Sequence, residues 1–493
     1  MLFNSAVFAV FLLASLALWY CLRYFLHKFK LKDNVDYSYY RLILVIYLIV
    51  ISVIFYSFWH PFYFLLLFWV GFVDFSLARV LGFAKSLPFR RLILGVSLIN
   101  SLGILIFFKY GQFIDENWAY ILGTPLSNNP EFWTHWLLPV GISFYTFQSI
   151  SYLVDVYRRE LAPEKSFFSY LLFLSFFPQL VAGPIVTAKS FLPQIRRPLP
   201  FLRIPIVFAV FLILLGLFKK MVLADHLAET SDFVFSHISE ISSKALWVGM
   251  FSYSFQIYCD FSGYTDIAQG AALLFGFRLP ENFKMPYLSA GFSEFWTRWH
   301  ISLSGWLKKY LYISLGGNRI GELFTYRNLF LVMAIGGLWH GASWNFVIWG
   351  SCHGLLLIFE RWGSGRWQLW SSGWMRPIRI LGTFLLVSLL WIFFRSSDFG
   401  SSLCYLQGLF TKKEGFSLPY TLEMSFLYCV FFIFIGHILG KYYFDDNKQL
   451  LGAFQKWQIS LGKTLVFSIF ASVFLILIVL FSADSKPFVY FVF

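Results

Sequence analysis

The chain has 493 residues, of which 58% are apolar and only 13% are charged. So few charges cannot cover a water-exposed globule, and so much apolar surface excludes a disordered chain. The composition therefore predicts a polytopic membrane protein, in which helices of about 20 residues allow roughly ten to twelve passes. The net charge of +14 is typical of cytoplasmic membrane loops, so it does not indicate a nucleic-acid partner.

In the first half of the chain, apolar runs alternate with basic loops. The run 6–22 has no basic residue before it and several after it, which places the N-terminus outside the cytoplasm. Further passes are predicted at 42–58, 62–78, 92–108 and 137–156. The apolar segment 167–183 has basic residues on both sides and contains Pro178, so we interpret it as re-entrant or lying within the bundle.

The second half predicts five more passes and leaves the C-terminus outside. They lie at 204–222, 246–277, 380–394, 421–440 and 464–481. The basic stretch 278–328 is the largest predicted cytoplasmic segment, and 329–359, interrupted at Gly336-Gly337 and Gly341, is predicted to be re-entrant. The fold class is thus an all-α polytopic membrane protein of about ten transmembrane helices. No repeat or linker divides 1–493, so we expect a single membrane domain.

The segment 295–311 is predicted to form one interfacial amphipathic helix. At 100° per residue its aromatic side chains gather on one face, toward lipid or the bundle, and its cations face the headgroups. His300 falls at the edge of the apolar face. It is either a residue at the membrane–water boundary of an anchoring helix or a residue of the functional site. The glycines before Asn318 and Arg319 predict a helix-ending turn, or less specifically an anion-binding loop.

His340 lies in an apolar, small-residue segment that we place within the membrane. Ionisable residues at that depth are costly and indicate function, and a neutral imidazole is the form that a general base needs. The alternative is a hydrogen-bonded core histidine. His353 is off this helix face and is interpreted as structural, while His437 is interpreted as interfacial.

Charged residues also interrupt two other apolar stretches. Asp260 and Asp266 are interpreted as structural partners of Arg or His, or as helix caps. Lys219 and Lys220 lie near the outer end of the pass 204–222, against the charge rule, and snorkelling is our only account of them.

Together these motifs resemble the membrane-bound O-acyltransferase family, in the bacterial branch that includes alginate and peptidoglycan O-acetyltransferases. The resemblance runs nearly end to end. Its less specific pieces are LPVGISF at 138–144, AGPI at 182–185, DFSGY at 260–264 and PENF at 280–283. Its most specific pieces are FWTRWHISLS at 295–304, YLYI at 310–313 with LGGNR at 315–319, and GLWHGASWN at 337–345.

The resemblance implies a central tunnel with His340 as the deep catalytic histidine and His300 as the second histidine at the cytoplasmic mouth. It implies substrate or tunnel roles for Trp339, Asn345, Trp299, Asn318, Arg319, Asp260 and Tyr264. The aromatic tail 483–493 is similar to that of acetylating members, which implies Tyr490 as an acyl relay on the outer side. The alternative for Tyr490 is an aromatic anchor at the membrane interface.

The resulting hypothesis is acetyl transfer across a bacterial inner membrane to an extracytoplasmic polysaccharide. A cytoplasmic thioester, acetyl-CoA, is the expected donor, with no bound cofactor and no metal. The expected partner is an extracytoplasmic serine-type, SGNH-like acetyltransferase. Transfer of D-alanyl or another acyl group is the first alternative. A lipid or glycan transporter predicts inverted repeats, and a polytopic glycosyltransferase predicts a carboxylate cluster, neither of which is evident in the sequence.

Overall fold

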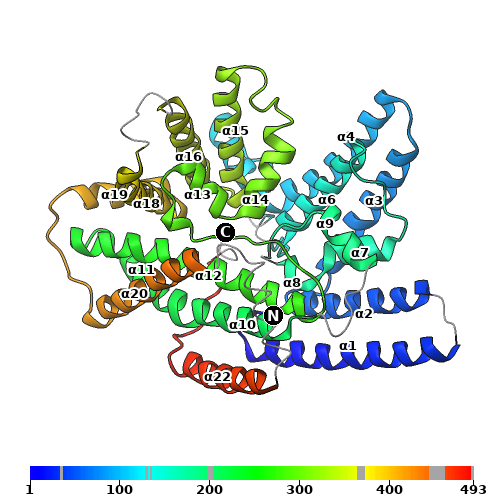
Figure 1. The fold of residues 1–493 in the computed structure, drawn as a ribbon. Helices are drawn as coiled ribbons and strands as arrows, with labels where there is room; N and C mark the ends of the chain where they lie inside the picture. Colours follow the sequence, from blue (N-terminus) through cyan, green and yellow to red (C-terminus); the bar gives the residue numbers. More distant parts are fainter. Residues whose placement is uncertain are drawn as a thin grey trace. The chain divides into compact units, whose positions relative to one another are not determined.

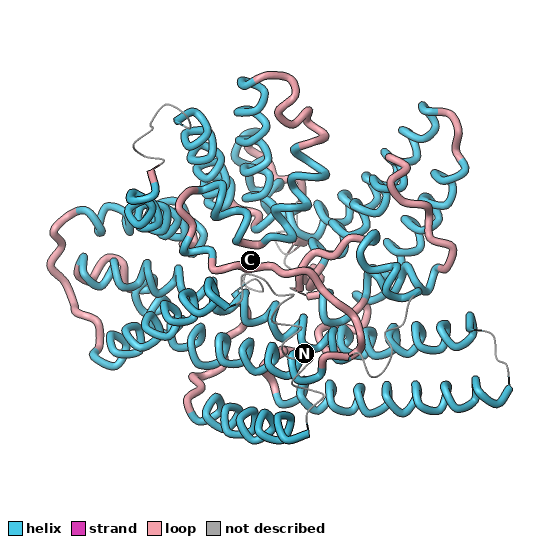
Figure 2. Tube along the Cα trace, in the orientation of Figure 1, coloured by secondary structure: helices cyan, strands magenta, loops and turns pink. Residues whose placement is uncertain are grey.

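The structure is a computed structural model that describes residues 1–33, 37–127, 132–133, 136–181, 183–196, 204–363, 372–443 and 461–489. Within these ranges the chain is helical and forms no strand beyond one isolated bridge, between Ile241 and Phe416 (Figure 2). The chain divides into two compact units: unit 1 is Met1–Ala209 with Ala268–Pro280, and unit 2 is Val210–Ile267 with Glu281–Phe493. The single membrane domain stays a prediction.

Eight helical spans in the described ranges are long and apolar enough to cross a membrane, by length and composition. They are Ala6–Leu26, Tyr39–Ser57, Tyr63–Phe83, Leu87–Leu122, Ile206–Ser236, Gly373–Arg395, Tyr420–Tyr442 and Gly462–Leu480. These coincide with eight of the ten predicted passes. The other two predicted passes are helices, α6 (Ile142–Tyr157) and α12 (Ser243–Leu274), that are not among the eight.

Unit 1 is a bundle of helices (Figure 1). Its helices are α1 (Ala6–Asp33), α2 (Tyr37–Ser57), α3 (Tyr63–Phe83), α4 (Leu87–Leu105), α5 (Gly111–Leu122), α6, α7 (Phe167–Ser175), α8 (Phe177–Leu180) and α9 (Ala188–Arg196). The segment 167–183 is a broken helix, because the chain turns extended at Phe176, just before Pro178. The described residues of α7 and α8 are almost entirely buried, which agrees with a place inside the bundle.

Two of the predicted passes, 92–108 and 204–222, continue as helices beyond their predicted ends. The helix α4 continues through a π-helical turn, η1 (Ile106–Tyr110), into α5, so Asp115 lies in a helix. Likewise α10 (Ile206–Leu217) continues through the π-helical η3 (Phe218–Ala224) into α11 (Asp225–Ser236). In both places a π-turn continues the helix beyond the predicted end of the apolar run.

The remaining helices belong mainly to unit 2. They are α12, η4 (Pro286–Leu288), α13 (Phe292–Arg298), α14 (Ile301–Trp306), the π-helical η5 (Leu307–Tyr312), α15 (Glu322–His340), α16 (Trp344–Gly363), η6 (Gly373–Met375), α18 (Arg376–Arg395), α19 (Phe399–Phe410), α20 (Tyr420–Tyr443) and α22 (Leu461–Leu480).

Helices α15 and α16 form a tight hairpin, joined by residues 341–343 (Figure 1). A Cβ atom on Gly337 would lie 2.2 Å from the carbonyl oxygen of Phe346, and one on Gly350 would lie 2.2 Å from that of Met333. The predicted interruption at Gly336-Gly337 is therefore wrong. Both glycines continue α15, Gly337 lets its backbone touch that of α16, and the helix ends only after His340.

Candidate functional site

His340 is the last residue of α15, and its side chain is enclosed by aromatic rings. The ring centroids of Trp339, Trp349 and Phe394 lie 5.0, 5.3 and 5.4 Å from that of the imidazole. Only 5% of His340 is exposed. The glycine-packed hairpin fixes this position, because α16 carries Trp349 and packs directly against α15. The imidazole thus lies in an apolar surround on a rigid support.

The predicted continuous helix over 295–311 is wrong, since the chain breaks at Trp299 and His300. Trp299 is extended, and His300 has φ +44° and ψ +53°, a left-handed conformation that is uncommon for a residue other than glycine. A helical wheel assumes 100° at every step, so it misplaced His300 at the edge of a face. His300 is fully buried, and the aromatic side of this segment packs into unit 2, with Trp299 in its core.

Asn282 holds His300 in place. Its Oδ1 atom accepts hydrogen bonds from the Ser302 backbone N–H at 3.2 Å and the Ser302 hydroxyl at 2.8 Å, and it lies 3.2 Å from His300 Nδ1. Because this oxygen is an acceptor, the hydrogen-bond network assigns the proton to Nδ1 and the lone pair of the neutral imidazole to Nε2. The Asn282 carbonyl also accepts from the Ile301 N–H at 3.0 Å, next to the left-handed turn.

Burial sets the protonation of His300, which lies outside the eight candidate membrane spans. Desolvation lowers the pKa of His300 to about 3 from its usual 6.5, because the apolar surround disfavours the charged form. His300 is therefore a neutral imidazole at physiological pH. Its ring contacts Phe261 edge-on at 4.7 Å between centroids.

The two predicted histidines are neighbours. The ring centroids of His300 and His340 lie 6.4 Å apart, and Trp339 contacts both rings, at 6.2 and 5.0 Å. Two distant motifs thus meet in one aromatic cluster of unit 2. Trp299 joins this cluster through Trp391, with ring centroids 5.1 Å apart.

The other two interior histidines differ from this pair. His353 is fully buried among aromatic rings, 4.9 Å from Trp349 and 5.1 Å from Trp296, consistent with the predicted packing role. His437 was predicted to be interfacial, and this is wrong. It is buried, its Nδ1 lies 2.9 Å from the Ile433 carbonyl oxygen, and its ring stacks on Tyr287.

The two aspartates of α12 that were predicted to pair with Arg or His pair with lysine instead. Lys220 Nζ lies 2.8 Å from Asp260 Oδ1 and 2.8 Å from Asp225 Oδ1, and Lys219 Nζ lies 2.7 Å from Asp266 Oδ2. Snorkelling is therefore not what places these lysines. Lysines near the outer end of a pass contradict the positive-inside rule. In the sequence, this exception could have indicated that their charges are neutralised by carboxylates inside the protein.

The remaining predicted site residues spread away from the histidine pair. Asn345 Nδ2 donates to the Ser396 carbonyl oxygen at 3.1 Å and so ties α16 to the end of α18. Tyr264 stacks on Phe488, with centroids 4.8 Å apart. Asn318 and Arg319 are exposed in the turn after η5. Tyr490 lies outside the described residues.

The LGGNR segment, residues 315–319, is a turn held by hydrogen bonds of its own backbone. The backbone N–H groups of Gly316, Gly317 and Arg319 donate to carbonyls within residues 312–316. The Asn328 side chain donates to the carbonyls of Leu315 and Gly317, at 3.2 and 2.9 Å. This bonding favours the helix-ending turn over an anion-binding loop.

Residues 92–399 match the model of a family described as MBOAT, membrane-bound O-acyltransferase family. The peptidoglycan O-acetyltransferase of Helicobacter pylori is 40% identical over 392 residues, covering 74% of this chain and 73% of that protein. The probable alginate O-acetylase AlgI of Pseudomonas putida is 41% identical over 354 residues, covering 71% of each chain. The teichoic acid D-alanyltransferase of Bacillus subtilis is 27% identical over 288 residues, covering 55% of this chain and 71% of that protein.

Proposed function

The chain belongs to the membrane-bound O-acyltransferase family and is a multi-pass membrane O-acyltransferase, and from this premise we propose that it transfers acetyl groups for the O-acetylation of an extracytoplasmic polysaccharide. The observation that carries this proposal is the buried pair His340 and His300, with ring centroids 6.4 Å apart in one aromatic cluster. The names of the relatives support the acetyl group and the polysaccharide as substrates.

In the proposed reaction His340 is the general base. Its imidazole removes the proton from the accepting hydroxyl, the hydroxyl oxygen attacks the thioester carbonyl, and the thiolate leaves and takes up the proton. The tryptophan and phenylalanine rings around His340 exclude water, which would otherwise hydrolyse the thioester. His300, held through Nδ1 by Asn282, presents Nε2 as a hydrogen-bond acceptor beside the same reaction path.

We propose acetyl-CoA as the donor, arriving from the cytoplasm beside the basic segment 278–328. The acceptor lies on the extracytoplasmic side, where both termini are proposed to lie. It is a serine on an SGNH-like acetyltransferase partner, or Tyr490 as a relay before that partner. One contact supports a role for the tail: Phe488 packs against Phe261, which itself contacts His300.

The test is acetyl transfer from radiolabelled acetyl-CoA by the purified protein in the presence of its polysaccharide-modifying partner. We expect His340→Ala to lose at least about a hundredfold in rate while the protein still folds. The matched control is His353→Ala, because His353 is an equally buried histidine in the same aromatic cluster. Normal transfer by His340→Ala, or equal loss in both variants, would contradict the role of His340.

The relay is tested separately with Tyr490→Phe. Loss of transfer with retained folding is expected if the tyrosine hydroxyl carries the acetyl group, and full activity rules the relay out. The relative named a D-alanyltransferase makes D-alanyl transfer the second candidate. It is distinguished by supplying a D-alanyl thioester in place of acetyl-CoA in the same assay.

A further inference from the structure

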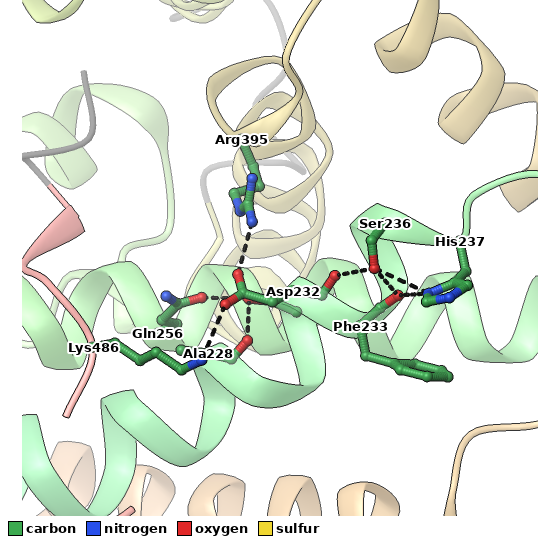
Figure 3. A network of polar contacts seen from close by, with 9 residues as sticks. Ala228, Asp232, Phe233, Ser236, His237, Gln256, Arg395 and Lys486 are labelled. Atoms are coloured by element: carbon green, nitrogen blue, oxygen red, sulfur yellow. Dashed lines mark hydrogen bonds and ion pairs between the residues drawn. The ribbon is translucent and has the colours of Figure 1, made fainter. Parts of the chain in front are cut away.

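The segment 483–489, which we call the C-terminal segment, is bound along its length to unit 2. The Ala483 backbone N–H donates to the Met221 carbonyl oxygen at 3.1 Å, and the Val489 N–H donates to Asp260 Oδ2 at 2.7 Å. Between them, Lys486 Nζ lies 4.0 Å from Asp232 Oδ2, beside Arg395 (Figure 3). These contacts hold both ends of the segment against unit 2.

The end of the segment is inserted among buried side chains. Phe488 is 2% exposed and Val489 is 7% exposed. The Phe488 ring stacks on Tyr264 of α12, and its centroid lies 5.8 Å from that of Phe261. Val489 is part of the same apolar cluster as Trp299. The end of the segment, at Phe488 and Val489, therefore forms part of the interior of unit 2, while Asp484, Ser485 and Pro487 are exposed.

A buried charged cluster lies where the segment ends. Lys220 is the one cation within ion-pair distance of Asp260 in the described chain, and it is shared with Asp225. One cation between two buried carboxylates leaves an excess of negative charge, and a buried carboxylate needs further hydrogen-bond donors. The C-terminal segment supplies them through the Val489 N–H to Asp260 and the Lys486 main chain to Asp225.

The same segment reaches the histidine pair through one intermediate ring. Phe261 contacts Phe488 on one side and His300 on the other, with centroids 5.8 and 4.7 Å away. Asp260, one residue before Phe261 on α12, holds the segment against this ring. Displacement of the segment would remove a wall behind His300.

We infer that Lys220, Asp225 and Asp260 form an anchor that binds the main chain of the C-terminal segment and thereby positions the aromatic wall of His300 for acyl transfer. The three are positioning residues, because their ion pairs and hydrogen bonds go to one another and to the main chain of the segment. The anchoring half of this inference stands on geometry alone. The catalytic half rests on the proposed function, and the two halves have separate measurements.

The experiment compares Asp260→Ala with Asp260→Asn. Both remove one negative charge and leave Lys220 paired with Asp225, but only Asn keeps an oxygen that accepts from the Val489 N–H. We expect Asp260→Ala to raise hydrogen–deuterium exchange in 483–489 at least about tenfold and to lower kcat about tenfold or more with little change in KM. Asp260→Asn is expected to restore both values.

A second variant removes the donor from the other side. Val489→Pro lacks the backbone N–H and leaves the buried carboxylates untouched, so it tests the anchor even if Asp260→Ala does not fold. It should reproduce the faster exchange in the segment and the lower kcat.

The matched control is Lys219→Met with Asp266→Asn, which removes the neighbouring ion pair on the same two helical elements and leaves the bonds of Asp260 and Asp225 to the segment in place. Equal exchange in Asp260→Ala and Asp260→Asn would overturn the anchor. Faster exchange with unchanged kcat would overturn the positioning of His300. If the wild-type protein transfers no acetyl group, the exchange measurement still decides the anchor.

Discussion

Unit 1 and unit 2 both bury ionisable side chains, yet they satisfy them in different ways. In unit 1 the guanidinium of Arg90 donates to the carbonyl oxygens of Leu81 and Ala84, at 2.9 and 3.2 Å, and to those of Val156 and Tyr157. It therefore caps the ends of α3 and α6. In unit 2 the imidazole of His340 is instead surrounded by aromatic rings.

A buried carboxylate in unit 1 is likewise satisfied by hydrogen bonds to nearby groups of the same unit. Asp74 Oδ2 accepts from the hydroxyls of Ser101 and Ser149, at 2.7 and 2.5 Å, and Ser149 also bonds the Tyr170 hydroxyl. All partners come from helices of the same bundle, so this group joins helices. The comparison shows that an ionisable residue inside a membrane protein is not by itself a catalytic site. The side chains around a buried ionisable residue indicate whether it joins helices or is a candidate for catalysis.

The largest effect is expected from Arg90→Met. It leaves carbonyl oxygens at two helix ends without their donor, and we expect a loss of about 3 kcal/mol in the free energy of unfolding. The activity of the protein that remains folded should be unchanged. Thermal unfolding in detergent measures the loss, with exposed Arg91→Met as the control. A loss of activity at normal stability would break the proposed contrast between the units.

A smaller loss is expected from Asp74→Ala, because the buried hydroxyls of Ser101 and Ser149 lose a shared acceptor. We expect about 2 kcal/mol, again without a change in the rate per folded molecule. Asp74→Asn keeps an acceptor oxygen and should recover most of the stability. If Asn and Ala are equally harmful, the charge of Asp74 matters more than its acceptor.

In unit 2, Asn282→Ala should affect the reaction more than the fold. Without the Asn282 oxygen the His300 ring is free to turn, and we expect kcat to fall about ten- to a hundredfold. Ser302→Ala is the control, since it removes the other side chain that donates to this oxygen and leaves the His300 contact in place. Equal losses in the two variants would assign Asn282 to folding alone.

For a change of one pH unit, the effect of His300 protonation is the smallest of these. The pKa of His300 is about 3 in the folded protein and about 6.5 when exposed, so the unfolded state binds more protons between these values. The stability contributed by neutral His300 is complete above pH 6.5 and falls as pH decreases, by at most about 1.4 kcal/mol per pH unit. His300→Asn, which tolerates the left-handed backbone, should show a shallower decline in thermal stability below pH 6.5. Identical slopes would contradict the burial argument.

Most of the membrane helices could be predicted from apolar runs, since an apolar run is a local feature of the sequence. The breaks could not. The end of the run near 108 looked like a helix end, but the π-turn η1 continues the helix, and the amphipathic pattern over 295–311 hid the turn at His300. Periodicity reports which residues share a face only while the helix continues.

The residues of the candidate site could be predicted where a sequence motif contains them. His340 and His300 stood out by motif, and the structure brings them together. Asn282 was present in the PENF motif without a role, because its bond to His300 spans 18 residues through a loop. The Val489 contact with Asp260 joins residues 229 positions apart, and no local pattern reports such a pairing.

The α15–α16 hairpin bears on how the protein is assembled during synthesis. Neither helix is among the eight candidate spans, although α15 has 19 residues and α16 has 20, about the length that crosses a bilayer. The two backbones touch at Gly337 and Gly350, and close backbone contact is what joins helices in a bilayer. We therefore expect α15 and α16 to enter the membrane as a packed pair, with Phe394 of α18 completing the surround of His340 afterwards.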